Sequence, residues 1–103
     1  MLDSIPACDQ VTELNELADL VTLQKALGVI TNLMTKDDES RIGITDIGGV
    51  EAVVKITKTF PKCQTLQERA CGVLLNFTYR NISGRQNIID SGGIEVLLHA
   101  VNN

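Results

Sequence analysis

Apolar residues recur at steps of three and four along most of the chain, a spacing that indicates amphipathic helices. The first predicted helix spans residues 9–21, with Asp9 as its N-cap. Its apolar positions are Val11, Leu14, Leu17, Ala18 and Val21. Further helices are predicted over residues 22–34, 39–46, 50–59, 65–79, 83–90 and 94–102. No segment alternates with a period of two, so no sheet is expected and the predicted fold class is all-α.

Local signals indicate where two of these helices begin. Thr65 with Glu68 has the spacing of a capping box, in which the first side chain caps the helix and the second reaches back to it. Ser83 with Gln86 has the same spacing. Helices are therefore predicted to begin close to Thr65 and Ser83.

The chain contains an internal repeat. When Ala26 is set over Ala70 and that offset of 44 (70 − 26) is kept, ten pairs of residues are identical. The pairs are Ala26/Ala70, Gly28/Gly72, Val29/Val73, Asn32/Asn76, Arg41/Arg85, Ile44/Ile88, Asp46/Asp90, Gly48/Gly92, Gly49/Gly93 and Glu51/Glu95. Each copy has the order long helix, short helix, Gly-Gly break, helix. A period in the forties is typical of helical solenoids, in which each unit buries its apolar face against the next.

Two segments carry a family resemblance. ALGVITNL followed by SRIGITDIGGVEAVV, and ACGVLLNF followed by GRQNIIDSGGIEVLL, resemble armadillo repeats. The resemblance covers residues 22–103 and implies a right-handed α-solenoid of about two repeats, truncated at both ends. It divides the chain into a tail and capping or partial-repeat helix (1–21), one repeat (22–64) and a second repeat (65–103) that lacks a following third helix.

Composition narrows the function classes. The chain has 103 residues, 44% of them hydrophobic, with three aromatic residues and no Trp, so an aliphatic core is expected. The formal net charge is −4 and the nine basic residues are dispersed, which argues against nucleic acid as a partner. There is no apolar run of bilayer length and no secretory signal pattern. We expect a cytoplasmic or nuclear protein with its three cysteines, Cys8, Cys63 and Cys71, reduced.

Two asparagines are the sharpest site candidates. Asn32 and Asn76 gain nothing from helix propensity, and each amide offers a donor and an acceptor. The resemblance implies that they bind the backbone of an extended peptide on a concave face. The alternative is that each amide satisfies loop carbonyls at its own helix end.

Gly28 and Gly72 lie one helical turn before the asparagines and share a face with them. A glycine inside a helix costs about 1 kcal/mol relative to alanine, so close approach of a neighbouring helix or of a ligand is expected there. Importin-α-like members carry Trp at this position, and its absence brings the chain closer to the β-catenin, plakophilin and vacuolar-adaptor branch.

Charged residues near the same stripe are the remaining groove candidates. Lys25, Arg69 and Arg80 would favour acidic peptides, although solvated helix charge is the alternative for each. Arg41 and Arg85 are equivalent in the repeat and are expected to be structural, paired with Asp46 and Asp90 or with loop carbonyls.

No set of residues predicts catalysis. The single His99, the dispersed cysteines and the absence of a phosphate-binding loop give no metal set, nucleophile pair or cofactor motif, so the chain is not expected to be an enzyme. The predicted function is binding of an extended segment of a protein partner. The alternative is self-assembly through uncovered solenoid ends or helix swapping, giving a homo-oligomer through Ile94, Leu97, Leu98 and Val101.

Overall fold

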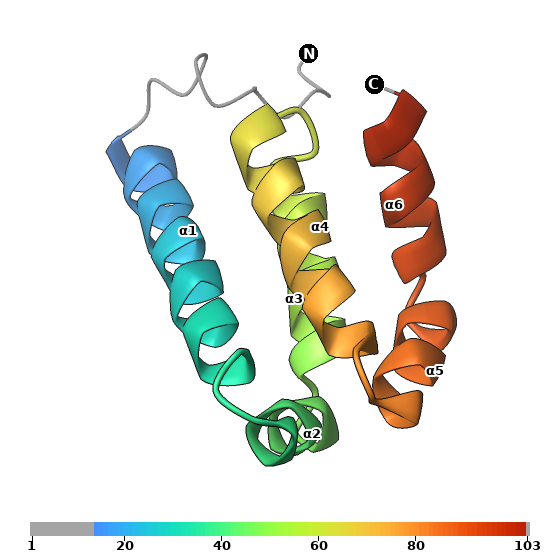
Figure 1. Cartoon of the computed structure of the whole chain (residues 1–103). Coiled ribbons are helices and arrows are strands. Elements are labelled where there is room, and N and C mark those ends of the chain that lie inside the picture. Colours follow the sequence, from blue (N-terminus) through green and yellow to red (C-terminus); the bar gives the residue numbers. More distant parts are fainter. Residues whose placement is uncertain (1–13, 103) are drawn as a thin grey trace.

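The computed structural model describes residues 14–102, and this part of the chain is all-α, as predicted (Figure 1). Its helices are α1 (Leu14–Met34), α2 (Asp38–Asp46), α3 (Gly49–Thr59), α4 (Gln64–Thr78), α5 (Ile82–Asp90) and α6 (Gly93–Asn102). No strand occurs between residues 14 and 102. From α2 onwards, each helix begins within one residue of its predicted start.

Helix α1 differs from the prediction. The sequence predicted two helices that meet between Val21 and Thr22, but α1 continues through this point without a break. Neither Gly nor Pro interrupts the chain here, and a β-branched Thr lowers helix propensity only slightly. The predicted N-cap, Asp9, lies outside the described residues.

The Gly-Gly pairs make the corner between the short helix and the next helix of each copy. Gly48 and Gly92 have φ angles of 92° and 86°, in the left-handed region that glycine adopts without steric cost. The second glycine of each pair, Gly49 or Gly93, has a different role. A Cβ atom on Gly49 would lie 2.6 Å from Ile44 Cγ2, and one on Gly93 would lie 2.7 Å from Ile88 Cγ2. The first glycine of each pair permits the turn, and the second allows the two helices to approach.

The N-caps are not those predicted. Helix α4 follows Cys63, which makes no side-chain capping bond, so the predicted capping box of Thr65 and Glu68 is wrong. Helix α5 is capped by Asn81 rather than Ser83, with Asn81 Oδ1 accepting a hydrogen bond from Gly84 N at 3.1 Å. Helix α2 is capped in the same way by Asp37, the residue equivalent to Asn81 in the repeat.

Arg41 and Arg85 are structural, and their partners are carbonyl groups. Arg41 Nη2 donates to Met34 O at 3.0 Å, and Arg85 Nε donates to Thr78 O at 2.9 Å. Both acceptors lie at the C-terminal end of the preceding long helix, seven residues before the arginine. No ion pair joins these arginines to Asp46 or Asp90 within the described chain, and Arg41 pairs instead with Asp38 at 2.7 Å.

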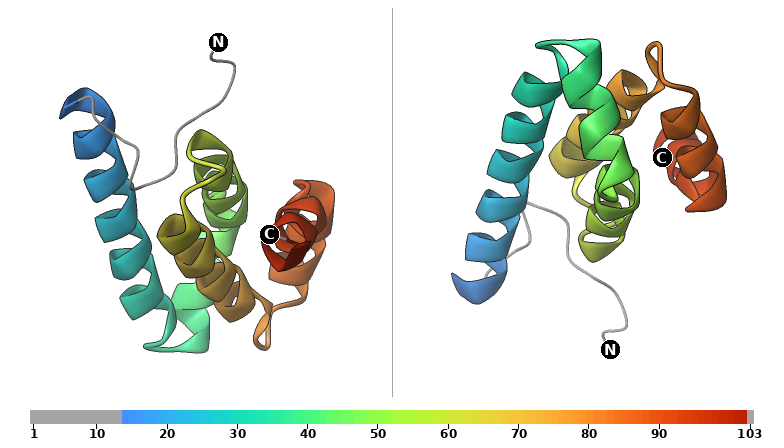
Figure 2. Two further views of the ribbon diagram at one scale, coloured as in Figure 1. Left: turned by 90° about the horizontal axis from the view of Figure 1, so that it is seen from above. Right: turned by 90° about the horizontal axis from the view of Figure 1, so that it is seen from below.

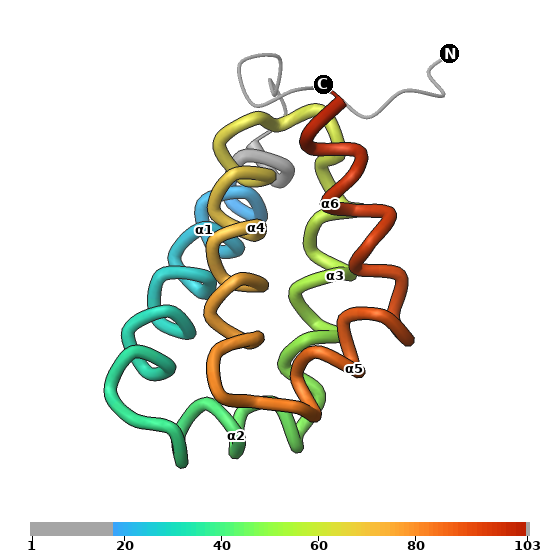
Figure 3. Tube along the Cα trace, turned by 45° about the vertical axis from the view of Figure 1, so that its right-hand side comes forward, coloured from blue at the N-terminus to red at the C-terminus, as the bar shows by residue number. Residues whose placement is uncertain are grey.

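Equivalent helices of the two copies lie side by side. Helices α1 and α4 are in contact, as are α2 and α5, and α3 and α6 (Figure 3). The short helices α2 and α5 occupy one end of the molecule (Figure 1). Seen from above and from below, α1 and α6 lie on opposite sides, with α3 and α4 between them (Figure 2).

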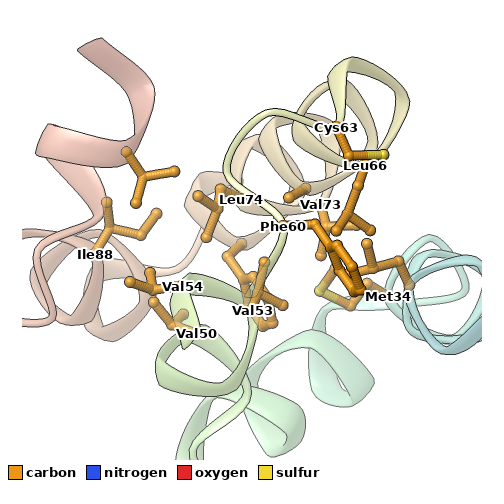
Figure 4. Close-up of a cluster of buried hydrophobic side chains, with 14 of the residues drawn as sticks. Met34, Val50, Val53, Val54, Phe60, Cys63, Leu66, Val73, Leu74 and Ile88 are labelled. Atoms are coloured by element: carbon orange, nitrogen blue, oxygen red, sulfur yellow. The ribbon is translucent and has the colours of Figure 1, made fainter. Parts of the chain in front are cut away.

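The core lies between the two copies rather than inside either one. Fully buried apolar side chains come from α1, α3 and α4 together, and include Met34, Val53, Leu66 and Val73 (Figure 4). Phe77 of α4 belongs to the same cluster. Gln67 closes this core at one end, where its Nε2 atom donates to Thr57 O at 2.8 Å and to Phe60 O at 3.2 Å. Neither copy therefore has a complete core of its own.

Candidate functional site

A groove of about 390 Å³ lies between α1 and α4. We call it the α1–α4 groove, and its lining residues are Leu27, Gly28, Thr31, Arg69, Gly72, Val73, Leu75 and Asn76. Four of the predicted peptide-binding residues, Gly28, Arg69, Gly72 and Asn76, therefore come together in one place. They reach it because α1 contributes one edge of its helix and α4 contributes the facing edge.

The two glycines leave open space in this groove. Among the described residues, a Cβ atom on Gly28 or Gly72 would meet no atom within 4 Å beyond its own helix. Close approach of a neighbouring helix, one of the two expected explanations, is therefore wrong. The cost of about 1 kcal/mol for each mid-helix glycine has no explanation in the packing of the described residues.

The two asparagines have different surroundings. Asn76 is half-buried in the groove wall, whereas Asn32 is exposed and lies outside the groove lining. Neither side-chain amide hydrogen-bonds to another described residue, so carbonyls at the helix ends do not occupy them. The amide donors and the acceptor of Asn76 are therefore unused within the described part of the chain.

A second hollow continues from the groove along α4 towards its C-terminal end. It has a volume of about 530 Å³, and its lining residues are Leu75, Asn76, Thr78, Tyr79, Arg80 and Arg85. It shares Leu75 and Asn76 with the α1–α4 groove, so the two form one continuous surface. The guanidinium group of Arg80 is exposed and forms an ion pair with Asp38 at 3.2 Å.

Lys25 and Asn32 are two predicted peptide-binding residues on an edge of α1 that does not line the α1–α4 groove. They are the repeat equivalents of Arg69 and Asn76, which line the groove from α4. Helix α1 faces the groove with its other edge, that of Leu27, Gly28 and Thr31. The residues between 14 and 102 place no helix against the edge that carries Lys25 and Asn32.

The sequence prediction missed two exposed side chains on this surface. Leu75 is 69% exposed in the groove, and Tyr79 is 59% exposed in the second hollow. Arg41 lies beneath the Tyr79 ring, 5.1 Å from its centroid, and this contact orients the ring. Both residues lie three positions after a predicted site residue, Gly72 or Asn76, so the helical spacing was a signal for them.

The predicted self-association residues are on α6. Ile94, Leu98 and Val101 are exposed to 42%, 57% and 80%, while Leu97 is half-buried against the core. These residues form an apolar surface without a covering helix among the described residues.

A further hollow of about 520 Å³ lies near the N-terminal end of α4. It contains none of the predicted site residues, and the Gln67 amide on its wall is already satisfied by two carbonyls. We therefore place the candidate site in the α1–α4 groove.

The cysteines differ from one another. The prediction that all are reduced is wrong for Cys63, which takes part in a disulfide, whereas Cys71 is free. Cys8 lies outside the described residues. Burial raises the pKa of the Cys71 thiol, and the Glu68 carboxylate raises it further, so this thiol stays protonated at neutral pH and is a poor nucleophile.

The described residues form neither a metal-binding cluster nor a membrane-spanning helix. No group of three His, Cys, Asp or Glu side chains in this part of the chain is placed to hold a metal ion. None of the helices between Leu14 and Asn102 combines the length and apolar character needed to cross a bilayer.

Comparisons of the chain with protein-family models, with curated proteins and with solved structures returned no match.

Proposed function

We propose that this chain is an armadillo-type repeat module whose α1–α4 groove binds an extended peptide segment of a partner protein. The support comes from the internal repeat, with its order of long helix, short helix, Gly-Gly corner and helix. One observation carries the proposal. Two equivalent mid-helix glycines, Gly28 and Gly72, face open space beside Asn76, whose side-chain amide makes no hydrogen bond to a described residue.

The geometry suggests how each residue contributes. Gly28 and Gly72 keep the floor of the groove free of side chains, so a peptide backbone can lie close to both helices. Asn76 is placed to donate to a peptide carbonyl and to accept from a peptide N–H. Leu75 and Tyr79 supply apolar surface for the peptide side chains.

Charge favours acidic peptides. Arg69 and Arg85 are exposed along the continuous surface, and no carboxylate of residues 14–102 lines either hollow. Arg80 is partly neutralised by Asp38, so Arg69 is the strongest candidate for selecting an acidic side chain. A single hydrogen bond of this kind contributes about 0.5–1.5 kcal/mol, so we expect weak binding by one groove.

The test is selection from a library of extended peptides, followed by affinity measurement with Asn76→Ala and Gly72→Leu variants. Both substitutions alter the groove and neither removes a core contact. We expect each variant to keep its helical circular dichroism and to lose at least several-fold in affinity. An enrichment of Asp and Glu in the selected peptides is expected, and Arg69→Ala should abolish it.

Two variants serve as matched controls. Asn32→Ala makes the same chemical change outside the groove, and Gly43→Ala fills an equally open mid-helix glycine on α2. Measured at low protein concentration, where the chain is monomeric, both should bind as the parent does. Equal binding by the parent and by Asn76→Ala and Gly72→Leu would remove the groove as the site.

Self-association is the second candidate function. It is supported by the exposure of Ile94, Leu98 and Val101, which lie together on α6. Contiguous exposed apolar side chains of this kind are common at protein–protein contact surfaces.

A further inference from the structure

The boundary between the two copies of the repeat buries apolar side chains from both sides. Helix α4 packs against α1 and α3 with four residues that are at most 2% exposed: Leu66, Ala70, Val73 and Phe77. On the other side of the boundary, Val50, Val53 and Val54 of α3 are also at most 2% exposed. Leu66 and Val73 of α4 and Val50, Val53 and Val54 of α3 belong to one cluster of buried side chains (Figure 4).

Helix α1 carries the equivalents of the packing residues of α4, but exposes them. Subtracting 44 gives Thr22, Ala26, Val29 and Leu33, which we call the α1 edge. Val29 and Leu33 are 57% and 49% exposed, against 2% and 0% for Val73 and Phe77. The α1 edge is therefore the equivalent of the α4 surface that packs on the first copy, but Val29 and Leu33 on it are exposed.

Helix α6 carries the complementary half. Ile94, Leu97 and Leu98 are equivalent to Val50, Val53 and Val54, and Ile89 on α5 is equivalent to Thr45. We call Ile89, Ile94, Leu97 and Leu98 the α6 face. Ile89 and Leu98 are each 57% exposed, whereas Thr45 and Val54 are each 2% exposed. An apolar hollow of about 310 Å³ lies on this face between α4, α5 and α6.

We infer that the α1 edge of a second copy of this chain packs on the α6 face, in the position that α4 occupies on the first repeat. The occupant is a second copy because the chain itself carries both halves of a contact whose geometry is present at its internal boundary. The inference rests on self-association, the second candidate function. The contact is head-to-tail and leaves one free half on each chain, so it continues into open oligomers rather than closing as a dimer.

The same contact completes a second groove. The α1–α4 groove needs one edge of α1 and the facing edge of α4. In the head-to-tail contact, Cys71, Gly72 and Leu75 take the places of Leu27, Gly28 and Thr31, and Lys25 and Asn32 of the second copy take the places of Arg69 and Asn76. The two predicted site residues that lie outside the groove in one chain thus enter an equivalent groove between chains.

Polar contacts of the internal boundary are lost at the contact between chains. Asn81 Nδ2 donates to Thr45 Oγ1 at 2.8 Å inside the chain, but the equivalent pair is Asp37 and Ile89. The Arg80–Asp38 ion pair is replaced by Lys36 and Ile82. The contact between chains therefore lacks both polar links and should be weaker than the internal boundary. Restoring the missing pair with Asp37→Asn and Ile89→Thr should tighten it.

The experiment is sedimentation velocity of the chain from micromolar to millimolar concentration. The parent should form concentration-dependent oligomers. One variant, Val29→Glu with Leu33→Glu, blocks the α1 edge, and another, Ile89→Glu with Leu98→Glu, blocks the α6 face. Each should be monomeric alone, and an equimolar mixture should form a single 1:1 complex, because one intact half remains on each chain. Ile47→Glu, at a residue that is 85% exposed and outside both surfaces, is the control and should behave as the parent.

The outcomes separate this inference from the functions already proposed. A parent that stays monomeric at millimolar concentration overturns both the inference and self-association, and leaves peptide binding in the α1–α4 groove unaffected. A parent that associates while both blocked variants also associate leaves self-association standing and overturns this register. Failure of the mixture to form the 1:1 complex, or of the Asp37→Asn, Ile89→Thr variant to associate more tightly than the parent, also counts against the register.

Discussion

The first and second copies of the repeat bury equivalent residues to different extents. Val29 and Val73 are the same residue at the same position of the repeat, yet they are 57% and 2% exposed. The difference is the neighbour: Val73 on α4 meets the first copy, whereas no described helix covers Val29 on α1. Burial in this protein is thus a property of the boundary between copies, and the repeat position alone does not determine it.

The polar residues of the two copies differ in the same direction. The helix caps Asp37 and Asn81 are equivalent, but Asp37 is exposed and Asn81 is buried and also bonded to Thr45. A buried carboxylate beside a hydroxyl would be costly to desolvate, whereas an amide can serve as cap acceptor and as donor at once. The copies have diverged where one faces its neighbour and the other faces solvent.

The largest expected effect comes from truncating the side chain at the centre of the boundary. Phe77→Ala should lower the free energy of unfolding by about 3–5 kcal/mol, because it removes a fully buried ring from the contact between copies. Leu33→Ala, at the equivalent position, should change it by less than about 0.5 kcal/mol. Urea denaturation measured at low protein concentration, where the chain is monomeric, tests both. Similar losses for the two variants would mean that the copies do not differ in burial as described.

A smaller loss is expected for the polar link across the boundary. Asn81→Ala removes the N-cap of α5 and the hydrogen bond to Thr45, for an expected loss of about 2 kcal/mol. A double-mutant cycle with Thr45→Val isolates the hydrogen bond from the cap. The two substitutions should be coupled, so that the double variant loses less than the sum of the single losses. Strictly additive losses would contradict a direct contact.

The comparison of copies also explains which elements were predictable. Helices from α2 to α6 were located closely because apolar spacing and the Gly-Gly corners are local signals. The continuity of α1 was missed: the sequence analysis divided this segment into two helices at Thr22, although no helix breaker lies there. Asn81 was missed as the cap of α5 because local spacing favoured Ser83. Its hydrogen bond to Thr45 was missed because Thr45 is distant in sequence.

The candidate site was predicted in part for the same reason. Helical spacing correctly placed Gly72 and Asn76 on one face and missed Leu75 and Tyr79 on the same stripe. Repeat equivalence suggested that Asn32 would share the surroundings of Asn76, but a groove requires two neighbouring helices. Within residues 14–102, α1 has such a neighbour on one side only. Sequence equivalence gives the position of a residue in its repeat and does not give its neighbour.

Glycine substitutions should have opposite effects on stability at positions with open space and at positions in close contact with a neighbour. Gly28→Ala and Gly72→Ala should each raise the free energy of unfolding by about 0.5–1 kcal/mol, because a methyl group there meets no described residue of another helix and favours the helical conformation. Gly49→Ala should lower it, since the methyl group would lie 2.6 Å from Ile44. Thermal unfolding of the three variants measures both signs. A loss of stability in Gly72→Ala would mean that the groove floor is already in use by packing.

The smallest expected effect is a pH dependence of the stability that comes from Asp37, the helix cap of the first copy. The hydrogen bond from Ser40 N holds the pKa of the Asp37 carboxyl below its usual value of 3.8, so the ionised form is favoured in the folded state. This stabilisation is present above the unfolded pKa and is lost as the pH falls through the folded pKa. Asn81 does not titrate, so Asp37→Asn should give the first copy the pH-independent cap of the second. The difference in stability between the parent and Asp37→Asn, measured by urea denaturation, should be constant from pH 7 to about pH 5 and should shift against the parent at lower pH. Subtracting the two curves removes the contribution of the other carboxylates. A difference that stays constant down to pH 2.5 would mean that the Asp37 carboxylate does not cap α2.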